Sequence, residues 1–127
     1  GLLDIPGEDP LDAAARELFE EAGYRATDWS VLVDAFNSPG GSDEAIRVYL
    51  ARGLTAVESE ARFQGEGEER DMPSRWVPLA AARDAVLGGR MHNALAVMGV
   101  LAASALLLDA APSVGAGRPA SAPWFGH

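Results

Sequence analysis

The sequence contains no cysteine and no lysine, and it has only two histidines, His92 and His127. Without cysteine, disulfide scaffolds, thiol nucleophiles and cysteine-based zinc sites are excluded. Two histidines are too few for a metal site built from several imidazole ligands. The chemistry of this chain therefore has to come from its carboxylates.

Positive charge is scarce as well. The chain has 10 basic residues, all of them arginine, against 19 Asp and Glu, which gives a formal net charge of -9 at pH 7. Nucleic acids and anionic membrane surfaces bind proteins through clustered positive charge. We therefore expect neither a nucleic acid nor a membrane among the partners, and we expect a cytoplasmic protein.

Long hydrophobic runs are also missing. The longest uncharged apolar stretch, 94–108, is rich in alanine and falls short of the roughly 20 residues that span a bilayer, so it predicts a buried helix. With 127 residues, 48% of them hydrophobic, the chain has the length of one domain with its own core.

The clearest local pattern is a helix over 10–22. Asp9 can cap it, Pro10 suits the first helical position, and Asp12 lies where the helix dipole favours negative charge. Gly23 stands where a left-handed residue ends a helix. Apolar residues at helical spacing form one face: Leu11, Ala15, Leu18 and Ala22.

The middle of the chain predicts a hairpin. Residues 29–36 and 45–54 have the composition and alternation of strands, and a turn rich in Ser, Pro and Gly joins them. Residues 58–71 are acidic, contain glycine and have no period, so they predict a loop. Residues 76–79 predict a short strand that Pro78 confines to an edge or an end.

The last part of the chain predicts two helices and a tail. Residues 79–87 and 91–108 are helical by pattern, and a pair of glycines separates them. From residue 110 onward Ala, Pro, Gly and Ser dominate, so we expect a disordered tail over 110–127 behind a domain over 1–109.

A stripe of three carboxylates marks the first helix. Glu17, Glu20 and Glu21 stand at i, i+3 and i+4, which places like charges on one side of the helix. One interpretation is a solvated acidic face on which Arg16 pairs with Glu20. The other is a site for a hard divalent cation, since Mg²⁺ prefers carboxylate and phosphate oxygens.

The wider stretch resembles the Nudix box, G-x5-E-x7-R-E-U-x-E-E-x-G-U, in which U is a bulky apolar residue. The residues in register are Glu8, Arg16, Glu17, Leu18, Glu20, Glu21, Gly23 and Tyr24. The family's leading glycine would stand at Leu2, whereas Gly1 comes one residue early; a single-residue insertion in the loop 3–7 accounts for this. The resemblance covers about residues 1–108.

The resemblance implies a fold and a metal site. The fold is α/β, a Nudix α/β/α sandwich with a mixed sheet, here lacking its N-terminal strands. Glu17 and Glu21 become the principal ligands of Mg²⁺, or of Mn²⁺ in its place, and Glu20 assists. Arg16 orients a neighbouring glutamate, while Glu8 supports the loop–helix geometry or joins the metal network.

The region after the box is similar to the ADP-ribose pyrophosphatase branch of the family. Pro39 stands at the offset from Gly23 that this branch shows, and the branch assigns Pro39, Gly40 and Glu44 to the substrate side of the site. The opening G-L-L-D also looks like a phrase of that branch. Taken alone, the Pro-Gly-Gly stretch is an ordinary hairpin loop.

Branch members usually carry a catalytic glutamate in a mobile loop that corresponds to 65–72. Glu69 is the best match, followed by Glu68 and then Glu66, and such a residue would act as the general base. A solvated acidic loop is the alternative for each of them. The resemblance to the family is weaker at His92, which we interpret as a structural or surface histidine rather than a ligand.

These expectations define two functions from different classes. The first is Mg²⁺-dependent hydrolysis of the pyrophosphate bond of ADP-ribose, or of a related nucleoside diphosphate sugar, to AMP and ribose 5-phosphate, by a protein that forms a homodimer. The second is a non-catalytic Nudix-like module that binds a nucleotide or a protein. Because strands are expected upstream, the chain by itself is predicted to be an inactive fragment with exposed apolar surface.

Overall fold

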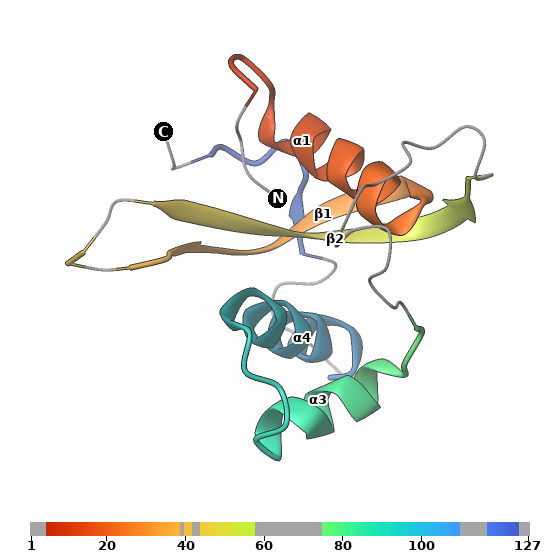
Figure 1. Cartoon of the computed structure of the whole chain (residues 1–127), viewed down its shortest axis with the longest axis vertical. Helices are drawn as coiled ribbons and strands as arrows, with labels where there is room; N and C mark the ends of the chain where they lie inside the picture. Colours follow the sequence, from red (N-terminus) through yellow and green to blue (C-terminus); the bar gives the residue numbers. More distant parts are fainter. Residues whose placement is uncertain (1–4, 39, 42–43, 58–74, 110–116, 125–127) are drawn as a thin grey trace. The chain divides into compact units, whose positions relative to one another are not determined.

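The computed structural model of the chain describes residues 5–38, 40–41, 44–57, 75–109 and 117–124. Helices and strands together place it in the α/β class, as predicted (Figure 1). In chain order the elements are α1 (Pro10–Glu17), the π-helix η1 (Leu18–Ala22), β1 (Tyr24–Phe36), β2 (Ala45–Ala56), α3 (Leu79–Leu87), α4 (Ala94–Leu107) and β3 (Arg118–Pro119).

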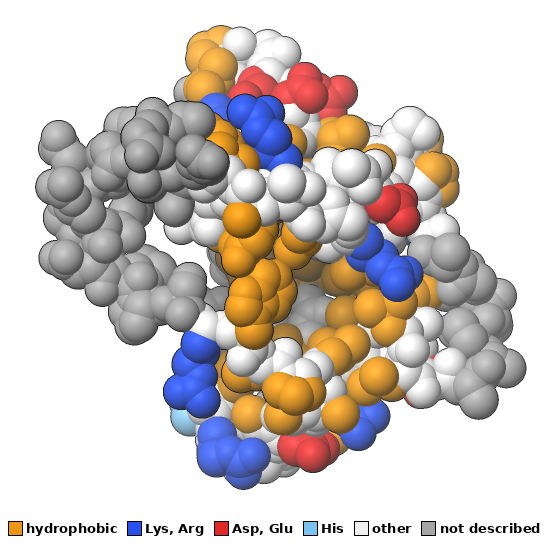
Figure 2. Space-filling view, turned by 90° about the vertical axis from the view of Figure 1, so that its right-hand side faces the viewer, with side chains coloured by type: hydrophobic (Ala, Val, Ile, Leu, Met, Phe, Trp, Pro, Cys, Tyr) orange, Lys and Arg blue, Asp and Glu red, His pale blue; other side chains and the backbone are white. Residues whose placement is uncertain are grey.

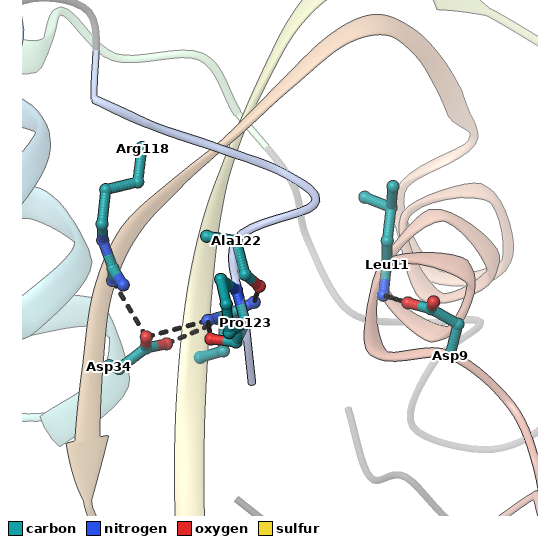
Figure 3. Close-up of polar contacts among 7 residues, drawn as sticks. Asp9, Leu11, Asp34, Arg118, Ala122 and Pro123 are labelled. Atoms are coloured by element: carbon teal, nitrogen blue, oxygen red, sulfur yellow. Dashed lines mark hydrogen bonds and ion pairs between the residues drawn. The ribbon is translucent and has the colours of Figure 1, made fainter. Parts of the chain in front are cut away.

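The first helix begins as its sequence predicts. The side chain of Asp9 accepts a hydrogen bond from the backbone N–H of Leu11 at 2.9 Å, which satisfies one of the unpaired donors of the first turn (Figure 3). Pro10 follows at the first helical position, where its missing N–H costs no hydrogen bond.

The end of this helix differs from a regular α-helix. The predicted helix 10–22 is α-helical only to Glu17, and Leu18–Ala22 form a π-helix. Gly23 ends it in the left-handed region at φ 77°, and its N–H donates to the carbonyls of Leu18 and Phe19, both at 3.1 Å. The bond to Leu18 spans five residues, which is the hydrogen-bond pattern of a π turn.

β1 and β2 form the predicted hairpin, and both strands are longer than predicted. β1 begins at Tyr24, and β2 continues to Ala56. Backbone bonds of 2.8 Å connect the two arms at both ends, from Asn37 N–H to Glu44 O and from Val57 N–H to Gly23 O. In the described sheet the strand order is β2-β1-β3.

The chain divides into two compact units, and the hairpin contributes to both. The first contains 1–28 and 51–76, with α1 and η1; the second contains 29–50 and 77–127, with α3, α4 and β3. The predicted boundary between a domain and a tail at residue 109 stays a prediction.

In the second unit, α3 has the predicted bounds, whereas α4 begins later than predicted. The side chain of Asn93 accepts from the N–H of Ala96 at 3.1 Å and so fixes the start of α4 at Ala94. The two helices pack on each other, and Ala82 and Ala103 are buried.

The predicted short strand at 76–79 is wrong. Residues 75–78 belong to no strand, and α3 already begins at Leu79. Pro78, at ψ 140°, is the residue that precedes the first turn of α3. Since proline has no N–H to give to a strand, its extended backbone serves here to lead into the helix instead.

Part of the tail is ordered where disorder was expected. Arg118 and Pro119 form β3, which pairs antiparallel with β1 in the register Ser30 with Pro119 and Val31 with Arg118. Among the described residues, Val31 is the largest side chain that is fully buried, with 1% of its surface exposed. Residues 110–116 and 125–127 lie outside the described part.

Large apolar side chains are exposed in the described residues, in line with the expected apolar surface (Figure 2). The most exposed are Trp76, at 72%, and Leu87, at 71%. None of the helices in the described ranges has the length and apolar character that crossing a membrane requires.

Candidate active site

The candidate site is built around Arg16, which lies on α1. Its Nε donates to Oε2 of Glu8 and its Nη2 to Oε1 of Glu8, both at 3.1 Å. This is the bidentate geometry in which a planar guanidinium matches a carboxylate best. Glu8 precedes the helix, so the pair ties the incoming chain to α1.

The remaining nitrogen of Arg16 is shared by two further carboxylates. Nη1 lies 3.3 Å from Oε2 of Glu20 and 3.5 Å from Oε1 of Glu17. Both contacts are longer than those to Glu8, and the two side chains keep 33% and 20% of their surface exposed. Glu17 and Glu20 thus direct oxygens at one point from adjacent parts of the helix.

This environment raises the pKa of Arg16 further above its usual value. The hydrogen bonds that Arg16 donates to Glu8 are the largest cause, desolvation opposes them, and the charges of Glu8, Glu17 and Glu20 add to the rise. Arg16 is therefore a permanent cation at the centre of the acidic stripe. It neutralises part of the repulsion that three neighbouring carboxylates would otherwise produce.

The π-helix sets the positions of the last two acidic residues. Glu20 and Glu21 both belong to η1, and Glu21 is exposed to solvent. A π turn is rare and occurs frequently at functional sites. The sequence motif predicts the glutamates and the final Gly23, but nothing in it marks the change from α to π geometry.

The acidic side chains fit a hard divalent cation in their chemistry. Glu17, Glu20 and Glu21 offer only carboxylate oxygens, which are the ligands that Mg²⁺ and Mn²⁺ prefer. Two of them already converge on one positively charged nitrogen, at 3.3 and 3.5 Å, and both distances are longer than the bonds between Arg16 and Glu8. Across the described ranges, however, three or more acidic or histidine side chains do not yet gather into a group that could hold a metal ion.

The remaining predicted residues belong to the second unit or are outside the described part. Glu44 is exposed at the hairpin turn, where Asn37 Nδ2 donates to its Oε1 at 3.4 Å, and Gly40 is exposed at φ 84°. Both belong to the second unit. The residues that the structure does not describe are Pro39, Glu66, Glu68 and Glu69.

His92 has a local structural contact. It is exposed, and its Nε2 lies 2.7 Å from the carbonyl oxygen of Gly89 in the connection between α3 and α4. This agrees with the prediction of a structural or surface histidine.

An arginine-centred acidic helix carries the residues of the Nudix box, and comparison with known proteins shows the family. The NUDIX domain family matches residues 1–96, and the chain belongs to this family. The ADP-ribose pyrophosphatase of Mycobacterium tuberculosis is 46% identical over 125 residues, which cover 98% of this chain and 57% of that protein.

Two further similarities concern shorter matches. The methanol dehydrogenase activator of Bacillus methanolicus is 46% identical over 66 residues, 47% of this chain and 36% of that protein. A crystal structure of an ADP compounds hydrolase matches with a TM-score of 0.62 and 28% identity, covering 80% of this chain and 52% of that one. The chain thus has the Nudix fold, and it spans less than two thirds of the length of each of these proteins.

Proposed function

We propose that the protein to which this chain belongs hydrolyses the pyrophosphate bond of ADP-ribose, or of a related nucleoside diphosphate sugar, to AMP and ribose 5-phosphate. The observation that carries the proposal is the convergence of Glu17 and Glu20 on one nitrogen of Arg16, within a Nudix box that is in register from Glu8 to Gly23. Such a set of oxygens suits a substrate whose phosphates must be neutralised before water can attack.

In this proposal the residues of the first unit prepare the cation site. Glu17 and Glu21 are the principal ligands of Mg²⁺ or Mn²⁺, and Glu20 assists. A divalent cation bound there supplies charge neutralisation for the non-bridging phosphate oxygens. Arg16 keeps its two short bonds to Glu8 and thereby holds the helix and the preceding chain in a fixed relation.

Residues of other segments accept the proton and bind the sugar nucleotide in this proposal. Glu69, or else Glu68, accepts the proton of the attacking water, since a carboxylate in a loop can approach once the substrate is bound. Pro39, Gly40 and Glu44 contact the substrate. Similarity to an ADP-ribose pyrophosphatase and to an ADP compounds hydrolase supports this substrate class. Homodimer formation and a cytoplasmic location remain part of the proposal.

The test is a substrate panel on the full-length protein. ADP-ribose, other nucleoside diphosphate sugars, nucleoside triphosphates and dinucleoside polyphosphates are compared with Mg²⁺, with Mn²⁺ and with excess chelator. We expect the highest kcat/KM for ADP-ribose or a related sugar nucleotide, and loss of turnover with chelator. A preference for triphosphates or dinucleoside polyphosphates would contradict the substrate class.

The same panel separates an enzyme from a binding module. A non-catalytic module would bind ADP-ribose with a measurable Kd and release no AMP, whether or not a divalent cation is present. The chain 1–127 is assayed in parallel and is expected to release AMP only at background rate, because it spans little more than half the length of the pyrophosphatase and the hydrolase that it matches.

A further inference from the structure

The segment 117–124, called the strap below, lies against the outer edge of β1, and its backbone pairing is very short. β3 has two residues, and one of them, Pro119, has no N–H to donate to the sheet. Strand pairing of this length contributes few hydrogen bonds, so side chains have to supply most of what holds the strap in place.

Arg47 of β2 supplies those contacts. Its Nη1 donates to the carbonyl oxygen of Ala122 at 2.8 Å, and its Nη2 donates to that of Pro123 at 2.7 Å. The guanidinium also lies over the ring of Trp124, 5.1 Å from its centre. With 4% of its side chain exposed, Arg47 is buried beneath the strap.

Asp34 of β1 holds Arg47 in the orientation that these contacts need. Its Oδ1 accepts from Arg47 Nε at 2.8 Å, and its Oδ2 accepts from Arg47 Nη2 at 3.0 Å. The same Oδ2 accepts from Nη2 of Arg118 in the strap at 2.9 Å (Figure 3). One carboxylate therefore joins residues from all three strands of the described sheet.

We infer that the strap is closed by this side-chain latch, in which Asp34 fixes Arg47 and Arg47 binds two strap carbonyls, and that opening the latch releases residues 117–124 from the edge of β1. The closed strap covers β1 at Ser30 and Val31. The open strap leaves that edge with unpaired backbone groups, the arrangement through which strands of separate molecules associate. The strap thus covers the edge of β1 when it is closed and exposes this edge when it opens.

Hydrogen–deuterium exchange of the strap amides, followed by mass spectrometry, tests this in the chain 1–127. The amide of Ala122, which donates to Pro119 O at 2.9 Å, is a protected reporter. We expect exchange in the strap to accelerate about tenfold or more in Arg47→Lys and in Asp34→Asn, because each loses charge-assisted hydrogen bonds. Exchange in α4 should stay at the rate of the parent chain.

Two further variants test whether strap exchange depends on the number of latch contacts: one removes a weaker contact, and the other is a control outside the latch. Arg118→Gln should accelerate exchange less than Arg47→Lys does, because the Arg118 side chain is 49% exposed and donates to Asp34 through Nη2. Asp84→Asn removes a carboxylate that is 68% exposed and lies 3.8 Å from Arg83, and it should leave the strap unchanged. Strap exchange at the parent rate in Arg47→Lys, with α4 still protected, would overturn the proposal.

A variant that unfolds the whole chain does not end the test. If Arg47→Lys also removes the protection of α4, Trp124→Leu decides the test, because it deletes the ring over which the Arg47 guanidinium lies and leaves the Asp34–Arg47 pair intact. Faster exchange of the strap alone in Trp124→Leu supports the latch. Unchanged exchange there, or simultaneous loss of protection in α4, contradicts it.

Discussion

Arg16 and Glu8 form a two-pronged ion pair in which both carboxylate oxygens of Glu8 accept bonds of 3.1 Å. The pair connects the chain before α1 with the last turn of that helix. Since it uses Nε and Nη2, only Nη1 is left to face Glu17 and Glu20. Arg16 therefore binds Glu8 with two of its nitrogens and faces the candidate cation site with the third.

Replacement of Arg16 by lysine should lower activity while the fold persists. Lysine keeps the charge but cannot bond both oxygens of Glu8 and approach Glu20 as well. We expect kcat/KM on ADP-ribose to fall about 10- to 100-fold in the full-length protein, as for other partners that orient ligands. Arg83→Lys, at a residue whose nearest acidic contact is 3.8 Å, is the control and should retain full activity. An Arg16→Lys protein with parental kcat/KM would show that the bidentate pair plays no part in the reaction.

Neutralising Glu21 should remove metal binding without unfolding the helix. Glu21→Gln keeps the size of the side chain but loses the charge that a hard cation needs. In the full-length protein we expect turnover to fall by orders of magnitude and Mn²⁺ affinity, measured by calorimetry, to fall with it. Asp12→Asn removes an exposed carboxylate from the first turn of α1 and should change neither quantity. Near-normal turnover in Glu21→Gln would exclude Glu21 from the cation site.

Gly23→Ala should destabilise the chain. Gly23 is buried at φ 77°, a conformation that side chains disfavour, and it ends η1. We expect a loss of about 1 kcal/mol in the free energy of unfolding, measured by urea denaturation. In Gly99→Ala an added Cβ meets Val48 Cγ1 at 3.4 Å, an ordinary contact, within a helix that favours alanine. That variant should be no less stable than the parent, and an equal loss in both would show that the left-handed conformation is not the cause.

Acid should weaken the contribution of Asp34 to stability. Hydrogen bonds from Arg47 hold the pKa of Asp34 below its usual 3.8, Arg118 adds to this and desolvation opposes it. Tyr49 also interacts with Arg47. Because the folded-state pKa is the lower one, the stabilisation is complete well above pH 3.8 and declines as the pH falls through the folded-state pKa.

The measurement compares the parent chain with Asp34→Asn from pH 6 downward. At pH 6 we expect the parent to be more stable by about 2 kcal/mol, the order of charge-assisted hydrogen bonds at a carboxylate of which 13% is exposed. The difference should shrink below pH 4. A difference that stays constant down to the acid limit would mean that the charge of Asp34 does not stabilise the fold.

Most of the fold in the described ranges could be predicted where a local signal exists. Asp9, Pro10 and Gly23 mark the helix ends through their own side-chain and backbone chemistry, and these ends are confirmed. The start of α4 was missed because Met91 and His92 fit a helical pattern, while the cap of Asn93 decides the boundary. The strand predicted before α3 failed because Pro78 suits both a strand end and a helix start.

The site shows the same division between local and distant contacts. Glu8, Arg16, Glu17 and Glu20 come from one short stretch, so a fixed spacing predicts their meeting. Arg47 and Ala122 are 75 residues apart, and no spacing in the sequence relates the two. A tail rich in Ala and Pro contains no sequence pattern that predicts hydrogen bonds from a buried arginine to the carbonyl groups of the tail. The roles of the residues in 58–74 stay predictions.

The small number of deeply buried apolar side chains has a thermodynamic consequence. Among the described residues, those in the core are Ala13, Val31, Ala82 and Ala103. Unfolding these elements therefore exposes less new apolar surface than unfolding a core of large, fully buried side chains would, and both the heat-capacity increment and the urea m-value scale with that surface. The chain should show a shallow dependence of stability on temperature and a broad, gradual denaturant transition, even where its midpoint is ordinary.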